Sequence, residues 1–262
     1  MKILITGING FIGQQLKDFF LKKKYSVFGI NSKSRNSDFR TLLRKKIRPD
    51  IIIHCAGSGI VGVEDISYRV HKKKNLDSTK ELISYIEKIK LKGCKIIFLS
   101  SQAVYGKVIV KKISEKNKIR PISNYGKTKL LAEKELKKIR ENSVIVLRLF
   151  SIYGNGLKKQ IIWDACNKMK LKKPIFKGTG LEIRDFLSIR DLKKLVFSII
   201  KMKINKYEIY NVGSGKGISI KKLIDKIKFY YFFKGKIKFI TKSNTAEKQN
   251  YVSQNKKVQR KF

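Results

Sequence analysis

The first half of the chain alternates short apolar runs with longer segments whose apolar residues recur at helical spacing. The apolar runs are rich in Ile and Val and occupy 3–6, 26–30, 51–55, 95–99 and 144–149. The predicted helices between them occupy 11–23, 39–46, 75–90 and 125–140. Short apolar strands separated by amphipathic helices are typical of a parallel sheet that helices cover on both faces. We therefore predict an α/β protein with a Rossmann-type, doubly wound parallel sheet, which would bind ligands at the carboxyl ends of its strands.

This regularity weakens after about residue 155. Short strand candidates at 175–177, 209–212 and 236–240 mix there with helices near 158–170, 190–202 and 219–229. We predict a dinucleotide-binding Rossmann domain over residues 1–154. A smaller, discontinuous substrate-binding lobe would occupy most of 155–262, with part of 180–215 returning to the main domain.

Composition narrows the class of partner. The formal net charge is +43 over 262 residues, but the excess is mainly Lys spread along the whole chain. Nucleic-acid sites concentrate Arg and aromatic residues on one element, so we expect no nucleic-acid partner, only a basic surface that attracts an anionic substrate. No apolar run reaches the roughly 18 residues of a membrane span, so we expect no membrane partner. The three cysteines are far apart, which predicts no disulfides, no metal site and a cytoplasmic location.

Residues 6–13 read TGINGFIG, between a predicted strand and a predicted helix. In this context Gly7 permits a tight turn, Gly10 lets the backbone approach a pyrophosphate, and Gly13 lets the helix pack on the sheet. The start of the helix, at Phe11 and Ile12, would offer amide donors and partial positive charge to the phosphates. The loop therefore predicts a dinucleotide site.

The end of the second strand bears on which dinucleotide binds. A carboxylate at that position would hold the ribose hydroxyls of NAD. The chain instead has Asn31, Ser32, Lys33 and Arg35. Basic and hydroxyl side chains favour the 2′-phosphate of NADP(H), whereas Asn31 can still hydrogen-bond a ribose hydroxyl of NAD(H). Both cofactors stay open, with NADP(H) favoured.

Tyr and Lys four residues apart form a known catalytic pattern, but Lys is so abundant here that the pattern also arises by chance. It occurs at 68/72, 125/129 and 230/234. Only Tyr125 and Lys129 follow a buried strand that ends in a hydroxyl, Ser101, and both begin the next helix on one face. Context therefore selects Ser101, Tyr125 and Lys129 as the catalytic residues.

The chemistry of these three residues suits oxidation and reduction at a carbinol carbon. A free tyrosine has a pKa of about 10. The Lys129 ammonium and a nicotinamide cation would lower the pKa of Tyr125. Tyr125 would then exchange a proton with a hydroxyl or carbonyl oxygen while hydride moves to or from nicotinamide. Ser101 would hydrogen-bond the same substrate oxygen, and Lys129 would also hold the cofactor ribose.

Several distinct motifs occur together between residue 1 and about residue 225. Besides TGINGFIG they are HCAG (54–57), NLDSTKELI from residue 75, SSQAVYG, YGKTK, LRLFSIYGNG (147–156), RDFLSIRDL (184–192) and YNVGSG (210–215). With these motifs the chain resembles extended short-chain dehydrogenases/reductases of the nucleotide-sugar (NAD-dependent) epimerase/dehydratase family. The resemblance implies a Rossmann domain, a small substrate domain, a nucleotide-sugar substrate and a homodimer formed through helices 75–90 and 125–140. It also implies, at the level of the family, a place in bacterial surface-polysaccharide biosynthesis.

The resemblance also implies roles for individual residues. The cofactor would be lined by Ala56, Gly57, Asn75 and Phe150, in addition to the residues above. The substrate would be contacted by Ser101, Gln102, Ser151 and Arg184, with Arg184 meeting the diphosphate.

Departures from the family pattern bear on the reaction. The 4,6-dehydratases of the family have an Asp-Glu pair where this chain has Gln102 and Ala103, so that branch lacks its acid and base. NAD-dependent epimerases usually have Asp at the position of Asn31, often Asn at Ser151 and Lys at Gly59. The leading expectation is therefore NADP(H)-dependent reduction of a 4-keto nucleotide sugar. An NAD-dependent C4 epimerase is the alternative, and a non-catalytic dinucleotide-binding protein, against which the intact catalytic residues argue, is a third.

Overall fold

The computed structural model describes residues 1–31, 38–58, 67–204, 206–240 and 250–262. Four residues considered above, Ser32, Lys33, Arg35 and Gly59, lie outside the described residues. Within the described part, no helix is both long and apolar enough to cross a membrane.

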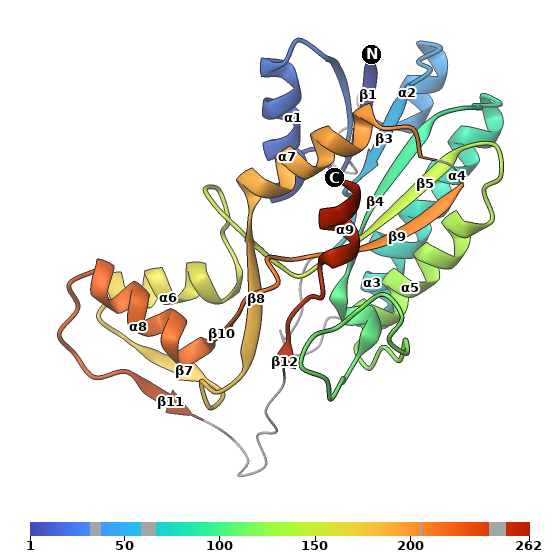
Figure 1. Ribbon diagram of the computed structural model, residues 1–262. Helices are drawn as coiled ribbons and strands as arrows, with labels where there is room; N and C mark the ends of the chain where they lie inside the picture. The colour runs from blue at the N-terminus through green and yellow to red at the C-terminus, as the bar shows by residue number, and fades with distance from the viewer. Residues whose placement is uncertain (32–37, 59–66, 205, 241–249) are drawn as a thin grey trace.

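The main sheet has six described strands, all parallel, in the order β2-β1-β3-β4-β5-β9 (Figure 1). They are β1 (Lys2–Thr6), β2 (Ser26–Ile30), β3 (Ile51–His54), β4 (Lys95–Ser101), β5 (Ser143–Leu149) and β9 (Tyr207–Val212). The predicted Rossmann-type parallel sheet is confirmed. The strand order reverses between β1 and β3, and ligands of such sheets bind outside the carboxyl ends at that point.

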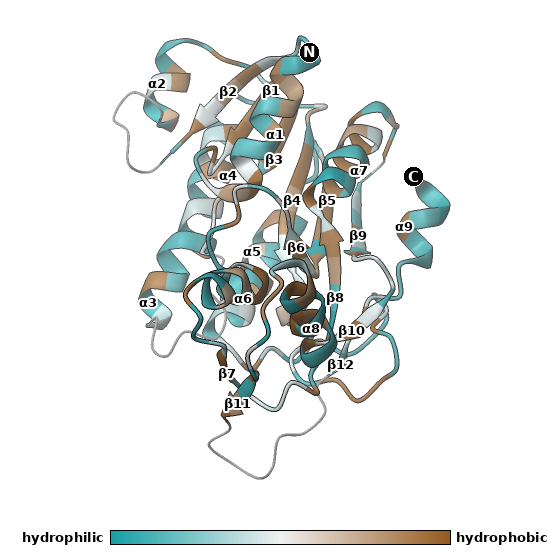
Figure 2. Ribbon diagram, turned by 90° about the vertical axis from the view of Figure 1, so that its left-hand side faces the viewer, coloured by the Kyte–Doolittle hydropathy of each residue, from teal (hydrophilic) through white to brown (hydrophobic). Residues whose placement is uncertain are grey.

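Helices cover both faces of this sheet, which explains why the strands are apolar throughout. One face packs against α1 (Phe11–Lys22) and α7 (Ile189–Lys201). The other packs against α2 (Phe39–Arg44), α4 (Ser78–Lys88) and α5 (Asn124–Lys137). Figure 2 shows the central strands in the brown of hydrophobic residues between these helices.

The predicted helix 75–90 is wrong at its start. The chain already turns helical at α3 (Tyr68–His71), where the Ser67 side chain accepts a hydrogen bond from the Val70 amide. A π-helical segment, Lys72–Asp77, then joins α3 to α4. Such wide turns are rare and frequently occur at functional sites. Asn75 lies inside this one.

The rest of the chain builds a smaller part beside the main sheet. Its mixed sheet contains β6 (Ser151–Tyr153), β8 (Ile183–Ser188), β10 (Gly217–Ser219) and β12 (Asn250–Tyr251). A third apolar cluster joins α6 (Gln160–Lys170) and α8 (Ile220–Tyr230) to the pair β7 (Ile175–Lys177) and β11 (Lys238–Ile240). The chain returns to the main sheet through α7 and β9, and α9 (Lys256–Lys261) packs beside β9 (Figure 1). The predicted domain boundary near residue 154 stays a prediction.

The Asp185 carboxylate holds the smaller part together. It is fully buried on β8 and accepts hydrogen bonds from the amides of Ser214 at 2.7 Å, Gly215 at 3.0 Å and Ser253 at 3.0 Å. The hydroxyls of Ser214 and Ser253 donate to it as well. These contacts join β8 to the loop after β9 and to the segment after β12. Both oxygens of the buried carboxylate thus have hydrogen-bond donors, as a buried polar group requires.

Candidate active site

A row of polar side chains crosses the carboxyl edge of the main sheet, on the face covered by α4 and α5. It contains one residue from each of five neighbouring strands: Thr6, His54, Ser100, Arg148 and Asn211. Each is at most 3% exposed. The strand register pairs Thr6 with His54, and Arg148 with both Ser100 and Asn211. Polar groups buried this deeply must satisfy one another, and the structure shows how they do so.

The glycine loop connects β1 to α1 through backbone contacts that leave no room for side chains. Gly7 has a left-handed φ of +68°, and a Cβ on it would lie 2.8 Å from the backbone of Ala56. A Cβ on Gly13 would lie 2.3 Å from the Gly7 carbonyl oxygen. The helix begins after Gly10 with no side-chain cap, while Phe11 and Ile12 pack against the apolar core. A helix N-terminus with uncovered amides behind a tight glycine turn fits a pyrophosphate.

The loop after β3 brings the predicted cofactor side next to the predicted catalytic side. The Ala56 amide donates to the Thr6 hydroxyl at 3.2 Å. A Cβ on Gly57 would lie 2.7 Å from Asn75 Oδ1 and 2.9 Å from Lys129 Nζ. Any larger residue at Gly57 would therefore displace one of these polar groups.

Ser101 and Tyr125 meet at the carboxyl end of β4. The Ser101 side chain lies near enough to the Tyr125 hydroxyl to lower the pKa of Tyr125. Ser123 caps α5 by accepting a hydrogen bond from the Gly126 amide at 3.0 Å. A Cβ on Gly126 would lie only 2.4 Å from the Ala103 carbonyl oxygen. Glycine thus lets the first turn of α5 sit directly on the turn that follows Ser101.

The predicted lowering of the Tyr125 pKa by Lys129 is wrong for this structure. Burial raises the pKa of Tyr125, and the hydrogen bond from Ser101 offsets this only in part. The reason lies in where the ammonium points. Lys129 Nζ donates to the Leu99 carbonyl oxygen at 2.8 Å and lies 4.7 Å above the Phe98 ring.

Lys129 itself is 4% exposed. Burial lowers its pKa from 10.5 to about 8, although Cys55 and Glu133 act in the opposite direction. Lys129 is therefore poised near physiological pH, and its Nζ lies against Gly57, only 2.9 Å from where a Cβ would stand. Perturbed groups of this type gather at functional sites.

Asn75 anchors the site from the π-helical segment. Its side chain accepts from the Ser58 amide at 3.1 Å and donates to Thr128 Oγ1 at 2.9 Å, so it ties the loop after β3 to α5. The Ser58 hydroxyl in turn is 2.6 Å from His71 Nδ1. Sequence reasoning missed Ser58, Thr128 and His71 as parts of the site. The available signal was weak: Thr128 directly precedes Lys129, and His71 stands one helical turn before Asn75.

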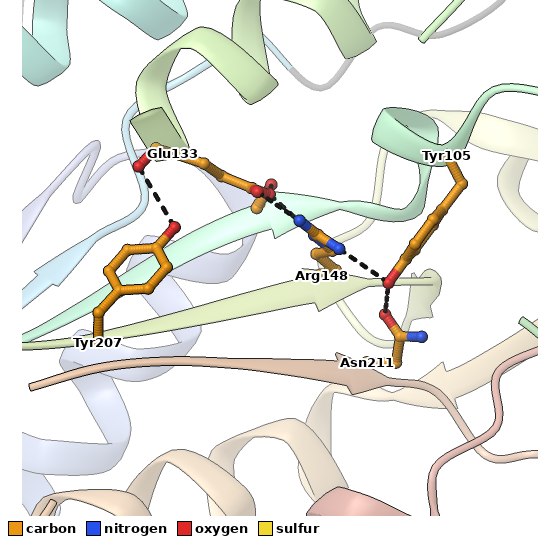
Figure 3. Close-up of polar contacts among 6 residues, drawn as sticks. Tyr105, Glu133, Arg148, Tyr207 and Asn211 are labelled. Carbon is orange, nitrogen blue, oxygen red and sulfur yellow. Dashed lines mark hydrogen bonds and ion pairs between the residues drawn. The ribbon is translucent and has the colours of Figure 1, made fainter. Parts of the chain in front are cut away.

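A buried ion pair positions α5 on the sheet (Figure 3). Arg148 donates from Nε to Glu133 Oε1 at 3.1 Å and from Nη2 to Oε2 at 2.7 Å. Its Nη1 donates to the Tyr105 hydroxyl at 3.0 Å, which donates to Asn211 Oδ1 at 2.7 Å. Ser100 completes the network by donating to Glu133. Burial acts to lower the pKa of Arg148, but the Glu133 contacts prevail and raise it, so the charge is permanent.

Sequence reasoning missed this pair too, although a signal was present. Tyr125, Lys129 and Glu133 are spaced four apart and so form one polar stripe on α5. Arg148 interrupts the apolar run of β5. A charge inside a buried strand requires a partner.

His54 has a structural environment. Its ring nitrogens are hydrogen-bonded to Thr6 Oγ1 and, at 2.8 Å, to Thr79 Oγ1. Burial, together with the charge of Lys129, lowers the pKa of His54 to about 3. The ring therefore stays neutral at physiological pH and links β1 to α4.

The predicted substrate residues lie at two places. Gln102 directly follows Ser101, and its buried Oε1 has no hydrogen-bond partner within the described residues. Phe150, which was predicted to line the cofactor, is buried against Val104 and Tyr105. Ser151 and Arg184 belong to the small mixed sheet, where the Arg184 guanidinium lies 4.5 Å from the centre of the Tyr251 ring.

The structure thus brings Ser101, Tyr125, Lys129, Asn75 and Gly57 together at the mouth of the glycine loop. The tyrosines of the other two Tyr/Lys patterns are exposed to solvent and lie outside this cluster. Tyr68 and Tyr230 are 42% and 77% exposed. The roles assigned to the clustered residues stay predictions.

This geometry agrees with the comparisons with known proteins. Residues 3–213 match the NAD dependent epimerase/dehydratase family. The chain belongs to this family. The family resemblance seen in the motifs, the enzyme class and a nicotinamide dinucleotide cofactor are thereby confirmed.

Individual members of the epimerase/dehydratase family are similar along most of their length. A putative UDP-glucose 4-epimerase of Methanocaldococcus jannaschii is 30% identical over 89% of this chain and 83% of its own. The UDP-glucuronic acid 4-epimerase of Bacillus cereus in complex with NAD has a TM-score of 0.82 and 25% identity, covering 99% of this chain and 92% of that one. The UDP-glucose 4-epimerase of Thermotoga maritima with UDP-glucose has a TM-score of 0.86, 22% identity and coverage of 99% and 92%, which shows the shared fold.

Proposed function

We propose that this chain is an NAD-dependent 4-epimerase of UDP-sugars. The observation that carries the proposal is the meeting of Ser101, Tyr125 and Lys129 beside the glycine loop, in a chain similar to 4-epimerases. The named relatives act at C4 of a UDP-sugar, and one was solved with NAD. Both points favour the epimerase over the reductase that the sequence alone put first.

In this proposal the side chains of the site transfer one proton to and from the C4 oxygen of the sugar. When bound, NAD supplies the hydride acceptor and donor for C4 and a positive charge in the site. Tyr125 accepts the proton of the C4 hydroxyl during oxidation and returns it during reduction. Ser101 hydrogen-bonds the same oxygen. Lys129 would hold the cofactor ribose, and the positive charge of the bound NAD would favour the tyrosinate against the burial that raises the Tyr125 pKa.

The remaining predicted residues take supporting roles in the same proposal. Ala56, Gly57 and Asn75 line the dinucleotide, and Phe150 closes the nicotinamide side. Gln102 and Ser151 face the sugar, and Arg184 binds the diphosphate. A homodimer would form through α4 and α5, as the family resemblance implies.

Reduction of a 4-keto nucleotide sugar with NADPH is the alternative. It is favoured by one observation, the absence of a carboxylate directly after β2, where Asn31 stands. The reductase would use the same Tyr125 and Ser101 but would exchange its dinucleotide in every turnover.

Epimerisation without added cofactor tests the proposal. The purified protein is incubated separately with UDP-glucose, UDP-galactose and UDP-glucuronic acid, and the products are identified by NMR. The proposal expects the C4 epimer of at least one of them to form with no dinucleotide added. A protein that leaves all three unchanged, yet oxidises NADPH with a 4-keto UDP-sugar, is the reductase.

A further inference from the structure

The C-terminal end of α8 lies at the outer end of the smaller part of the molecule (orange, left edge of Figure 1), and four consecutive aromatic residues there are exposed. Phe229, Tyr230 and Phe232 are 74%, 77% and 87% exposed, and Tyr231 is 44% exposed. These four residues are called the aromatic tip below. Single exposed apolar side chains are common, but a contiguous cluster of large ones marks an interaction site.

The chain turns at the aromatic tip through a left-handed backbone conformation that is strained for a residue with a Cβ. The Phe233 amide donates to the Lys228 carbonyl oxygen at 3.1 Å, and Phe232 has a left-handed φ of +49°. This is the helix-ending turn in which glycine is strongly preferred, because a Cβ there is strained. Phe233 packs inward on the third apolar cluster, while Phe232 points into solvent. The same left-handed position after α1, α2, α4 and α6 holds a lysine, namely Lys24, Lys46, Lys90 and Lys172. Phe232 differs from these residues in exposing a large apolar side chain to solvent.

The surroundings of the aromatic tip are basic. Residues 226–240 contain five lysines and no Asp or Glu. The end of α6 lies beside the end of α8 in both Figure 1 and Figure 2, and the two helices share one apolar cluster. That helix end adds the 66% exposed Leu171 and four lysines within 165–173, of which Lys168 is paired with Asp164 at 2.8 Å. Apolar side chains and lysines thus share one surface.

We propose that the aromatic tip docks on the surface of an anionic lipid bilayer. Its side chains protrude, so they fit a partner into which they can insert. The interfacial region of a bilayer accommodates aromatic rings in this way. A second copy of this chain would bring lysines against lysines. Lysines around inserted apolar residues are the typical composition of surfaces that bind anionic membranes. The expectation of no membrane partner considered only spanning segments and stays a prediction, from which this proposal departs.

Vesicle flotation with a matched set of variants tests this docking. The protein should float with vesicles of phosphatidylcholine mixed with phosphatidylglycerol, and far less with phosphatidylcholine alone. The double variant Phe229→Ser/Phe232→Gly should bind the mixed vesicles at least about tenfold more weakly, since two apolar anchors are lost. Glycine at 232 suits the left-handed turn, so folding is preserved. Ile109→Ser, which removes a 93% exposed apolar residue elsewhere, should bind like the parent.

Fluorescence provides a second readout. The chain has a single tryptophan, Trp163, so Phe229→Trp in a Trp163→Phe background reports on the aromatic tip alone. Its emission should shift to the blue when mixed vesicles are added. Equal flotation of the double variant and the parent would show attraction by net charge only and overturn the proposal. Absence of binding to the mixed vesicles would also overturn the proposal. The same holds if the protein binds a single-stranded oligonucleotide instead of the vesicles and the double variant loses that binding.

Discussion

The two faces of the main sheet differ most at its carboxyl edge. On each of four strands, adjacent residues point to opposite faces there. Toward α1 and α7 the chain places Ile5, Ile53, Leu99 and Leu147, and toward α4 and α5 it places Thr6, His54, Ser100 and Arg148. All eight side chains are buried. At this edge one face is apolar, and the other carries polar side chains that bind one another, although the rest of that face is apolar as well.

This difference assigns separate tasks to the two faces. Burying apolar surface against α1 and α7 contributes stability without directional contacts. Burying polar groups gains little net stability, because desolvation cancels much of each contact. What the polar face provides is position: Glu133 fixes α5 to β4 and β5, and α5 carries Tyr125 and Lys129. The catalytic residues therefore lie on the α4 and α5 face, where burying polar groups costs more desolvation free energy.

Removing the phenol hydroxyl should have the largest effect. Tyr125→Phe deletes the group that moves the proton, so turnover should fall by about 10²–10⁴-fold. Dinucleotide retention should be unchanged, because the ring remains. Tyr68→Phe, from another Tyr/Lys pattern, is the matched control and should keep full turnover. Comparable turnover of the Tyr125 variant and the parent would remove Tyr125 from the mechanism.

Introducing methionine at neighbouring positions of β5 compares the two faces directly. Arg148→Met leaves Glu133 buried without its partner and should lower the free energy of unfolding by about 3–5 kcal/mol. Leu147→Met, one residue away on the apolar face, conserves volume and should cost less than about 1.5 kcal/mol. Urea unfolding of both variants measures the difference. Equal losses would mean that the ion pair does not hold α5.

The buried ammonium of Lys129 predicts a pH dependence of stability. Its pKa falls from 10.5 to about 8 on folding. Below about pH 8 Lys129 is protonated in both the folded and the unfolded protein, so the folded protein bears the full cost of burying the charged ammonium. Between about 8 and 10.5 only the unfolded state keeps the proton, so the parent gains stability as pH rises, by roughly a few kcal/mol.

The difference in unfolding free energy between the parent and Lys129→Met isolates this effect from the other lysines. It should shift in favour of the parent as pH rises through the window. Lys127→Met, at an exposed position of the same helix, should show no such shift. A difference that stays constant with pH would mean that Lys129 is not desolvated.

The smallest effect concerns the link between β3 and α4. Thr79→Val removes the hydroxyl that bonds His54 and the Asn75 carbonyl oxygen, at a cost of about 1–3 kcal/mol. Ser78→Ala, at the half-exposed neighbouring position, should cost within about 0.5 kcal/mol. Thermal unfolding separates the two. Equal stability of both variants would show that His54 does not depend on this partner.

The apolar face was predictable from the sequence and the polar face largely was not. Strand and helix periods depend on neighbouring residues, and so β1 to β5 and α1 were predicted nearly to their ends. The catalytic cluster was found because Ser101 ends a strand and Tyr125 begins the next helix. Arg148 and Glu133, by contrast, are 15 residues apart, and only the packing of α5 on the sheet pairs them.

The smaller part of the molecule shows a second reason for missed elements. β8 was not predicted, because a strand that carries Arg184 and Asp185 has no clear alternation. β10 and β12 are only three and two residues long, and they exist because β8 pairs with them across long stretches of sequence. The left-handed backbone at Phe232 follows from the helix-ending turn, not from the residue type.

Identifying the dinucleotide that the purified protein carries tests the proposed function most directly. The protein is denatured, and the released cofactor is identified and quantified by mass spectrometry. An epimerase reuses one cofactor molecule, so we expect NAD or NADH in near-stoichiometric amount. Recovery of NADP or NADPH, or of no dinucleotide, would contradict the epimerase and point to a reductase that exchanges its cofactor.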